Sequence, residues 1–284
     1  MDLSKRLKSI DVIVSDVDGT LLKNDGTISK NTIKLVKELS SLGVIFTLAT
    51  GRLHSATVEI TNALGLKAPV ISLDGSLIRI APEGNIVFEN FLSKKHVLNA
   101  IRYATENLFQ IVLCHADAIY YTEHNSLIPD LLSKYGATYR EVKSYDTYID
   151  GTLEIVFTSE NYNKLKKTSE RFLFPYTFGC SISFFRSLRR ENIYYLEVRK
   201  SGCDKGHGLK KLLKHVKRNI TATAVLGDWY NDVSLFKTRA LKVAVANAIP
   251  EIKDKADMIT ENTNDTDAVA EFLEKVLKAK KGIL

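Results

Sequence analysis

Two patterns alternate along the first part of the chain. Continuous apolar runs at residues 12–14, 44–49 and 69–73 predict strands that are buried on both faces. Between these runs, apolar residues at helical spacing predict helices over about 33–42 and 55–64. This order of strand, helix, strand, helix, strand favours a parallel sheet with right-handed crossovers.

The pattern changes after about residue 76. Residues 77–80 and 86–88 flank a Pro-Glu-Gly-Asn segment and predict a hairpin. Further helices are expected at 94–106, 127–135 and 162–172, and further strands at 110–114, 118–121, 153–157, 181–185 and 194–198. Most of the aromatic residues lie here, and the stretch is interpreted as an α+β module with antiparallel content.

The parallel pattern then returns. Helices are expected at 209–216, 232–237 and 268–278, and strands at 222–226 and 242–246. We therefore expect one α/β domain with a parallel sheet, made of residues 1–83 and 196–284. A second, inserted domain at 84–195 interrupts it.

Composition narrows the class of protein. Of the 284 residues, 45% are hydrophobic and 26% are charged, which is typical of a globular protein with a sizeable core. No apolar run approaches the roughly 18 residues that span a bilayer, and the polar N-terminus does not resemble a signal peptide. We expect a cytoplasmic protein without a membrane partner.

The cysteines and the net charge narrow the class of protein less than the overall composition does. Cys114, Cys180 and Cys203 are far apart, which favours free thiols and argues against a zinc site. The net charge of +7 is explained mainly by a solvated surface, although it also suits an anionic substrate. No signature of a nucleic-acid-binding protein is present, so no nucleic-acid partner is expected.

Candidate chemistry clusters where strands are expected to end. Ligands of open α/β sheets bind outside the carboxyl ends of the strands. Four polar motifs fall at such places, and their coincidence carries more weight than any one of them.

The first motif follows strand 12–14. Asp16 and Asp18 lie two residues apart and precede Gly19, which permits a tight turn, so both carboxylates can point into one crevice. One carboxylate can attack phosphorus and hold a hard cation while the other handles protons. A turn with helix-capping aspartates is the structural alternative. A calcium loop of the EF-hand type is disfavoured because its twelfth position holds Thr27.

The second and third motifs can bind phosphate. Thr50 and Gly51 follow the second buried strand and precede Arg52; a hydroxyl and freed amides there can hydrogen-bond a phosphoryl oxygen, or cap a helix. Lys205, at a predicted helix start, can reduce the repulsion between an anionic nucleophile and phosphate. An ordinary surface lysine is the alternative in a chain with 40 basic residues.

The fourth motif spans residues 227–232. Asp228 and Asp232 lie four residues apart behind strand 222–226, with Asn231 next to Asp232. This arrangement suits Mg²⁺, which prefers one or two carboxylates together with water and phosphate oxygens. Helix capping by Asp228 is the alternative, but it leaves Asn231 and Asp232 unexplained.

Taken in order, the motifs resemble those of the haloacid dehalogenase (HAD) superfamily. The matching runs are Asp-Val-Asp-Gly-Thr at 16–20, Ala-Thr-Gly-Arg at 49–52, Lys-Gly at 205–206 and Gly-Asp-Trp-Tyr-Asn-Asp at 227–232, with later echoes at 246–248 and 264–267. The resemblance spans the whole chain. The large insertion resembles the Cof-type branch (subfamily IIB), whose members are mostly small-molecule phosphatases. It implies a Rossmann-like three-layer core with a parallel sheet and an inserted α+β cap domain of the C2 type.

The resemblance also implies roles for the two aspartates of the first motif. Asp16 would be the nucleophile that forms an aspartyl-phosphate. Asp18 would protonate the leaving group and then activate water, while its backbone carbonyl binds Mg²⁺.

Phosphate and metal binding follow from the same resemblance. Asp16 and Asp228 would ligate the metal directly, and Asn231 and Asp232 would orient its water shell. Thr50 and Lys205 would hold the phosphoryl oxygens. The substrate-binding residues expected from the motifs are Thr50, Gly51, Arg52, Lys205 and Asn231.

The chain departs from the family pattern in two places. Family members often carry Asn-Gly-Ala after the third strand, where this chain has Asp74-Gly75-Ser76. The extra carboxylate would disfavour very anionic substrates or cap the turn. Ala246 stands where glycine is common. Neither change touches the chemistry that the motifs imply.

The inserted domain is expected to act as a lid that selects the substrate. Candidate selecting residues are His115, Asp117, Tyr120, Tyr121, His124 and the run Phe184-Phe185-Arg186. Core packing of the aromatics and surface exposure of the histidines is the alternative for each of them.

The function expected is a Mg²⁺-dependent phosphatase that hydrolyses a small phosphorylated metabolite, such as a sugar phosphate, in a monomer or homodimer. A phosphotransferase or phosphomutase of the same fold is the alternative. A non-catalytic binding protein would need a broken motif, and all four motifs are intact.

Overall fold

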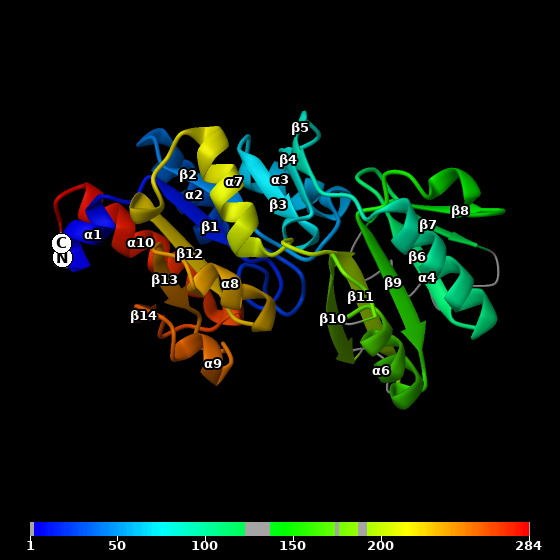
Figure 1. The fold of residues 1–284 in the computed structure, drawn as a ribbon. Coiled ribbons are helices and arrows are strands. Elements are labelled where there is room, and N and C mark those ends of the chain that lie inside the picture. Colours follow the sequence, from blue (N-terminus) through cyan, green and yellow to red (C-terminus); the bar gives the residue numbers. More distant parts are fainter. Residues whose placement is uncertain (1–2, 123–136, 174–175, 187–191, 284) are drawn as a thin grey trace. The chain divides into compact units, whose positions relative to one another are not determined.

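The computed structural model describes residues 3–122, 137–173, 176–186 and 192–283 (Figure 1). The chain forms two compact units. The first unit comprises Met1–Gly51, Val58–Val87 and Asp204–Leu284, and the second comprises Arg52–Thr57 and Phe88–Cys203. The helix expected at 127–135 and the candidate residue His124 lie outside the described residues.

A parallel sheet organises the first unit. In the described part of the chain it has five strands in the order β14-β13-β12-β1-β2. Their bounds are β1 (Val12–Ser15), β2 (Ile45–Leu48), β12 (Thr223–Gly227), β13 (Leu241–Ala244) and β14 (Met258–Ile259). Val14 of the central strand lies opposite Val225 on one side and Thr47 on the other. The strands are almost wholly buried, as the continuous apolar runs predict.

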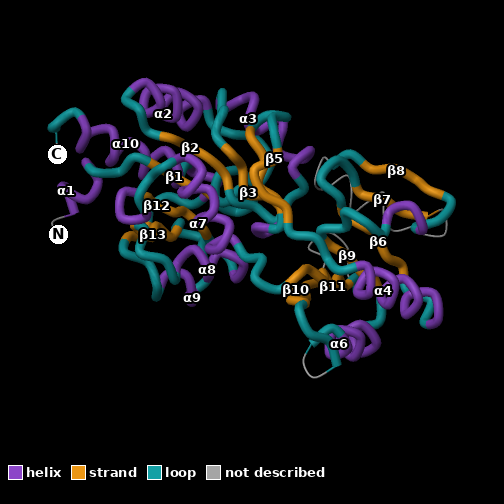
Figure 2. The backbone as a smooth tube through the Cα atoms, turned by 45° about the horizontal axis from the view of Figure 1, so that its top comes forward, coloured by secondary structure: helices purple, strands orange, loops and turns teal. Residues whose placement is uncertain are grey.

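Helices cover both faces of this sheet (Figure 2). Their bounds are α1 (Leu3–Lys8), α2 (Lys30–Ser41), α3 (Val58–Leu64), α7 (Lys205–Val216), α8 (Val233–Phe236), α9 (Pro250–Lys253) and α10 (Ala268–Lys280). Alternate strand residues such as Ile13, Phe46 and Leu226 share one core with α2 and α10. Because side chains alternate along a strand, their neighbours face the opposite side, where α7 and α8 pack together.

The third strand departs from the simple parallel order. β3 (Pro69–Ser72) meets β2 through a single parallel bridge between Ala49 and Ile71. Its regular partner is the antiparallel β4 (Leu77–Ile80), followed by β5 (Ile86–Glu89). Pro69 has no N–H to donate, and its carbonyl accepts a hydrogen bond from the Thr47 hydroxyl, which shortens the ladder. The hairpin expected at 77–88 is present.

The second unit is built on a mainly antiparallel sheet. Its six strands in the described residues run in the order β10-β11-β9-β6-β7-β8. The elements are α4 (Lys94–Glu106), β6 (Gln110–Cys114), β7 (Ile119–Thr122), β8 (Tyr139–Val142), β9 (Glu154–Ser159), α6 (Tyr162–Arg171), β10 (Cys180–Arg186) and β11 (Tyr194–Lys200). Phe157, Leu113 and Leu196 from three strands form its apolar core with α4 and α6. On the sheet, Arg199 forms a buried ion pair with Glu154.

Several short elements were not expected from the sequence. β8 is an edge strand whose residues are largely exposed, so it lacks the apolar alternation that marks a strand. The helices α1 and α9 and the two-residue strand β14 are too short for a periodic signal. Among the described residues, no helix is long and apolar enough to cross a membrane.

Candidate active site

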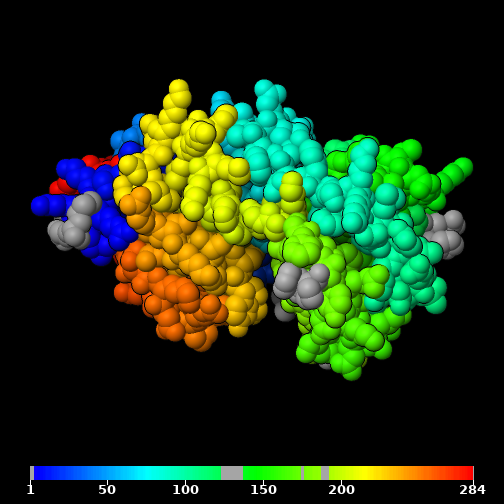
Figure 3. Space-filling model, in the orientation of Figure 1, coloured from blue at the N-terminus to red at the C-terminus, as the bar shows by residue number. Residues whose placement is uncertain are grey.

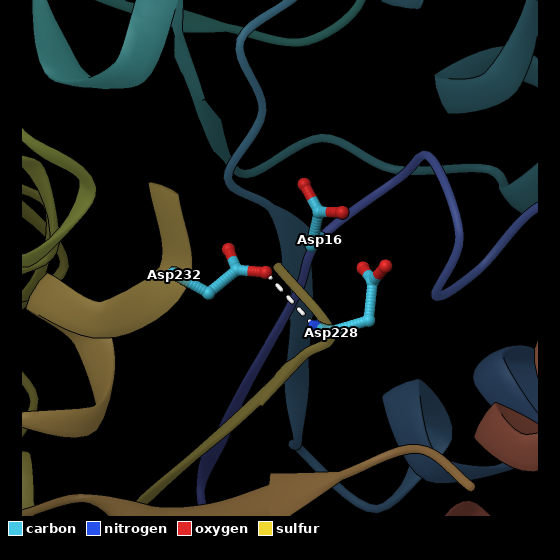
Figure 4. Close-up of side chains that lie close together, drawn as sticks. All are labelled: Asp16, Asp228 and Asp232. Carbon is cyan, nitrogen blue, oxygen red and sulfur yellow. Dashed lines mark hydrogen bonds between the residues drawn. The ribbon is translucent and has the colours of Figure 1, made fainter. Parts of the chain in front are cut away.

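Three aspartates lie together at the carboxyl ends of the central strands (Figure 4). Asp16 directly follows β1, Asp228 directly follows the neighbouring β12, and Asp232 ends the short helical turn Tyr230–Asp232. One carboxylate oxygen of each lies within 4.8 Å of those of the other two. All three side chains are buried, so three carboxylates lie close together where water solvates them poorly.

Lys205 neutralises part of this charge. It is the first residue of α7 and its side chain is fully buried. Its Nζ donates to Asp16 Oδ1 at 2.6 Å and to Asp232 Oδ1 at 2.7 Å. The ammonium thus joins the strand end that carries Asp16 to the turn that carries Asp232. Buried charges persist only when they are paired in this way.

Asp232 is occupied on both oxygens. Its Oδ2 accepts the backbone N–H of Asp228 at 2.9 Å and that of Trp229 at 3.2 Å, while Oδ1 accepts from Lys205. The side chain therefore fixes the loop after β12. This leaves Asp16 and Asp228 as the carboxylates with free coordinating capacity beside it.

Burial and mutual repulsion shift the titration of the site. Burial raises the pKa of Asp16 well above its usual value; Lys205 opposes the shift, and Asp232 and Asp228 add to it. Burial and the charge of Asp232 raise the pKa of Asp228 to about 7. Burial lowers the pKa of Lys205, but the carboxylates of Asp16, Asp232 and Asp74 together raise it above its ordinary value. A hard divalent cation would reduce the repulsion between these carboxylates, and oxygen donors are the ligands that such a cation prefers.

The loops after β2 and β3 meet beside this cluster. Thr50 lies just beyond β2, buried, and its backbone N–H donates to Ile71 O at 2.8 Å. Asp74 is buried in the left-handed region (φ 46°), and its backbone N–H donates to Thr50 O at 3.0 Å. Its Oδ1 accepts from Asn231 Nδ2 at 3.2 Å. Asp74 thus connects three loops of the first unit, in addition to starting a turn.

Gly19 allows the first loop to pass close to Asp228. It has φ +80°, and a Cβ at this position would overlap the Asp228 carboxyl group. Asp18, one residue earlier, is exposed. Gly51 faces the Asp74 carboxylate, and Arg52 belongs to the second unit.

Some residues of the site carried no strong signal in the sequence. Thr20 donates its hydroxyl to Asp228 Oδ1 at 2.7 Å. Asn247 Nδ2 donates to Gly19 O at 2.7 Å, and Asn264 Nδ2 donates to Leu22 O at 2.9 Å. Asn247 Oδ1 in turn accepts from Asn264 N at 2.8 Å. The two asparagines belong to the late motif echoes, and they hold the loop after β1 in place.

The candidate selecting residues of the second unit fall into two groups. Tyr120 donates to Asp117 at 2.9 Å and stacks on Tyr148, with ring centroids 4.2 Å apart. His115 Nε2 is 2.9 Å from Tyr148 O. His115 and Asp117 lie between β6 and β7, Tyr120 and Tyr121 are on β7, and Tyr148 follows β8. The run Phe184-Phe185-Arg186 is on β10, at the other edge of the sheet.

A family model of haloacid dehalogenase-like hydrolases matches residues 13–273. The chain belongs to this family. HAD phosphatases generally use a divalent metal, and the aspartate cluster described above has the oxygen donors for one.

Several known proteins resemble the chain along nearly its whole length. Phosphatase YwpJ of Bacillus subtilis (strain 168) is 27% identical over 289 residues, which cover 94% of this chain and 99% of YwpJ. A haloacid dehalogenase-like hydrolase from Bacteroides thetaiotaomicron superposes with a TM-score of 0.82 at 27% identity, covering 94% of this chain and 99% of that one. TM0651 from Thermotoga maritima gives 0.81 at 25% identity, with 94% and 97% covered.

These similarities confirm three predictions. The chain is a HAD-type hydrolase with phosphatases among its relatives, it is therefore an enzyme, and its α/β fold combines a parallel core sheet with a sheet-rich additional domain.

Replacing Lys205 by methionine should destabilise the protein in a pH-dependent way. The variant leaves Asp16 and Asp232 buried without their cation, which we expect to cost about 3–5 kcal/mol at pH 8. Because the folded pKa of Asp16 is raised, its carboxyl group takes up a proton as the pH falls, and the loss should be smaller at pH 5.

Chemical denaturation at the two pH values measures this loss. Lys210→Met is the matched control, since Lys210 is exposed on the same helix and its replacement should change stability by no more than about 0.5 kcal/mol. An equal loss for Lys205→Met at pH 5 and pH 8 would show that packing, and not charge, is what the lysine contributes.

Proposed function

We propose that the protein is a Mg²⁺-dependent phosphatase that hydrolyses a small phosphorylated metabolite through an aspartyl-phosphate on Asp16. The observation that carries this proposal is the pairing of Asp16 with Lys205 at 2.6 Å, beside Asp228, at the carboxyl end of β1. A carboxylate in this setting is held in one orientation, and a cation stands next to the place where a phosphoryl group would arrive.

Asp16 and Asp228 would hold the metal, together with the backbone carbonyl of Asp18. Bound Mg²⁺ would supply positive charge to the phosphoryl oxygens and so reduce their repulsion of Asp16. Asp232, with both oxygens engaged by Lys205 and two backbone amides, fits a supporting role around the metal better than direct ligation.

The reaction would have two steps. In the first, a carboxylate oxygen of Asp16 bonds to phosphorus while the bond to the leaving oxygen breaks, and Asp18 gives that oxygen a proton. In the second, Asp18 takes a proton from water, the water oxygen bonds to phosphorus, and the bond to Asp16 breaks. Asp18 is exposed on the turn next to Asp16, where it can exchange protons with solvent.

Substrate recognition would be divided between the two units. Thr50, Gly51 and Lys205 would bind the phosphoryl group, with Arg52 and Asn231 as further candidates. We propose that residues 84–195 form the domain that selects the rest of the substrate, with a sugar phosphate or a similar compound as the substrate class. His115, Asp117 and Tyr120 are the strongest candidates in that domain because they form one hydrogen-bonded and stacked cluster with Tyr148.

Replacing Asp16 by asparagine should abolish phosphatase activity while leaving the fold intact. The amide cannot act as the nucleophile, so we expect phosphate release from p-nitrophenyl phosphate with Mg²⁺ to fall by at least about a thousandfold. Asp254→Asn, at an exposed position of the same unit, is the matched control and should keep full activity. Circular dichroism checks the fold, and persistent activity in a folded Asp16→Asn protein would refute the assignment of the nucleophile.

Mg²⁺ affinity should rise with pH between pH 6 and pH 8. The pKa of Asp228 is raised to about 7, so below that value a proton occupies the carboxyl group and must leave before the metal binds. We expect the affinity to increase by up to about tenfold per pH unit below pH 7 and to level off above it. Isothermal titration calorimetry measures this, and an affinity that does not change with pH would contradict it. Asp228→Asn should bind Mg²⁺ weakly and without the pH dependence.

A phosphotransferase of the same fold is the second candidate, because an aspartyl-phosphate can be resolved by water or by another hydroxyl group. We expect that p-nitrophenol and inorganic phosphate are released in equal amounts whether or not acceptor alcohols and sugars are present. A deficit of free phosphate with a matching amount of phosphorylated acceptor would establish transfer instead. A panel of phosphorylated metabolites assayed with Mg²⁺ then identifies the substrate.

A further inference from the structure

A second candidate site lies at the far end of the helix that begins with Lys205. It is a pocket of about 430 Å³ lined by Lys210, Leu213, Lys214, Lys217, Arg218, Asn219 and Ile220. It is shallow and open to solvent: five of its seven lining residues are exposed, and Leu213 is buried beneath them. Since α7 has 12 residues, its two ends are about 18 Å apart, and the pocket is separate from the aspartate cluster.

The lining of this pocket is strongly cationic. Four of its seven residues are lysine or arginine and none is acidic. The sequence from Lys205 to Gly227 holds six basic residues and no aspartate or glutamate. Without the five exposed basic residues of this segment, the net charge of the chain would be +2 and not +7. The segment lies at the surface of the first unit, where Figure 3 draws it in yellow.

The four pocket cations differ from other lysines of the same unit. Lys242 pairs with Asp257 at 3.3 Å, and Lys275 pairs with Glu271 at 2.7 Å. In the described part of the chain, by contrast, Lys210, Lys214, Lys217 and Arg218 make neither an ion pair nor a side-chain hydrogen bond. Like charges gathered without a counter-charge repel one another, so an anion that entered the pocket would be attracted by all four.

The backbone of the pocket wall is held in place. Lys217 ends α7 in the left-handed region, and the backbone N–H groups of Lys217 and Arg218 both donate to Leu213 O. Asn219 Oδ1 accepts from the backbone N–H and the hydroxyl of Thr221, each at 3.1 Å. This fixes the amide and leaves Asn219 Nδ2 as a further donor. The pocket therefore combines cations, an oriented amide and an apolar base formed by Leu213 and Ile220.

We propose that this pocket binds a small organic anion that carries two or more phosphate groups. Ammonium and guanidinium groups are the side chains that bind phosphate best, and a compact set of four suits linked phosphates better than one. The apolar base accommodates a small organic part. Aromatic side chains for stacking bases are absent from the lining, which argues against a single-stranded nucleic acid as the ligand.

The test compares two double variants of the full chain. Lys214→Gln with Arg218→Gln removes two pocket charges, and Lys37→Gln with Lys278→Gln removes two exposed charges from α2 and α10. Calorimetry with inorganic pyrophosphate and with ADP, in EDTA at low salt, gives the affinities. We expect the pocket variant to bind about tenfold more weakly than the wild type and the control variant to stay within about twofold. Equal affinity in the two variants would overturn the proposal.

A labelling experiment locates the binding directly. Pyrophosphate should protect Lys214 and Lys217 from an amine-reactive reagent, as seen by mass spectrometry, while Lys37 stays reactive. Unchanged reactivity of Lys214 and Lys217 in the presence of saturating pyrophosphate would overturn the proposal. So would a single-stranded RNA or an anionic vesicle that binds through the pocket residues when pyrophosphate and ADP do not.

Discussion

The buried ammonium group of Lys205 makes the two ion pairs on which the arrangement of the first unit depends. It brings together Asp16 at the end of β1 and Asp232 in the turn after β12, at 2.6 and 2.7 Å. In turn Asp232 holds the backbone at Asp228 and Trp229. One cation thereby sets the positions of α7, the central strand and the loop after β12 relative to one another. Removing it would leave charges that the protein interior cannot solvate.

The surrounding loops are shaped by the same crowding. The loop after β1 passes so close to Asp228 that a Cβ at Gly19 would overlap the Asp228 carboxyl group. Asn247 and Asn264 hold that loop from the other side through its backbone carbonyls. Asp74 adopts a strained, left-handed backbone conformation. Its hydrogen bonds link the loops after β2, β3 and β12. Such strain persists only where neighbouring contacts determine the conformation fully, as at a binding site.

The sequence indicates the strand-end part of this arrangement well and the supporting part poorly. Asp16 and Asp228 could be expected to lie close together. Continuous apolar runs predict the strands that precede them, and the carboxyl ends of parallel strands lie at one edge of a sheet. The roles of Asn247 and Asn264 could not be expected, because their partners are 228 and 242 residues away in the chain and only the folded protein brings them close. Likewise, a buried run such as Pro69–Ser72 predicts a strand but does not indicate which strands it pairs with. The exposed strand β8 has no hydrophobic pattern from which it could be predicted.

Charge also constrains the order of events at the site. The chain is basic overall, with a net charge of +7, yet the place where phosphate would bind holds Asp16, Asp228 and Asp232 around Lys205. Surface charges more than about 8 Å away are largely screened at physiological salt, so the local carboxylates dominate what an incoming anion experiences. When ionised, the three carboxylates and Lys205 together carry a net charge of −2, which a divalent cation would cancel. Under the function proposed above, metal binding should therefore precede substrate binding. A phosphate dianion that arrived first would face carboxyl groups whose pKa is raised by burial and by the charge of their neighbours.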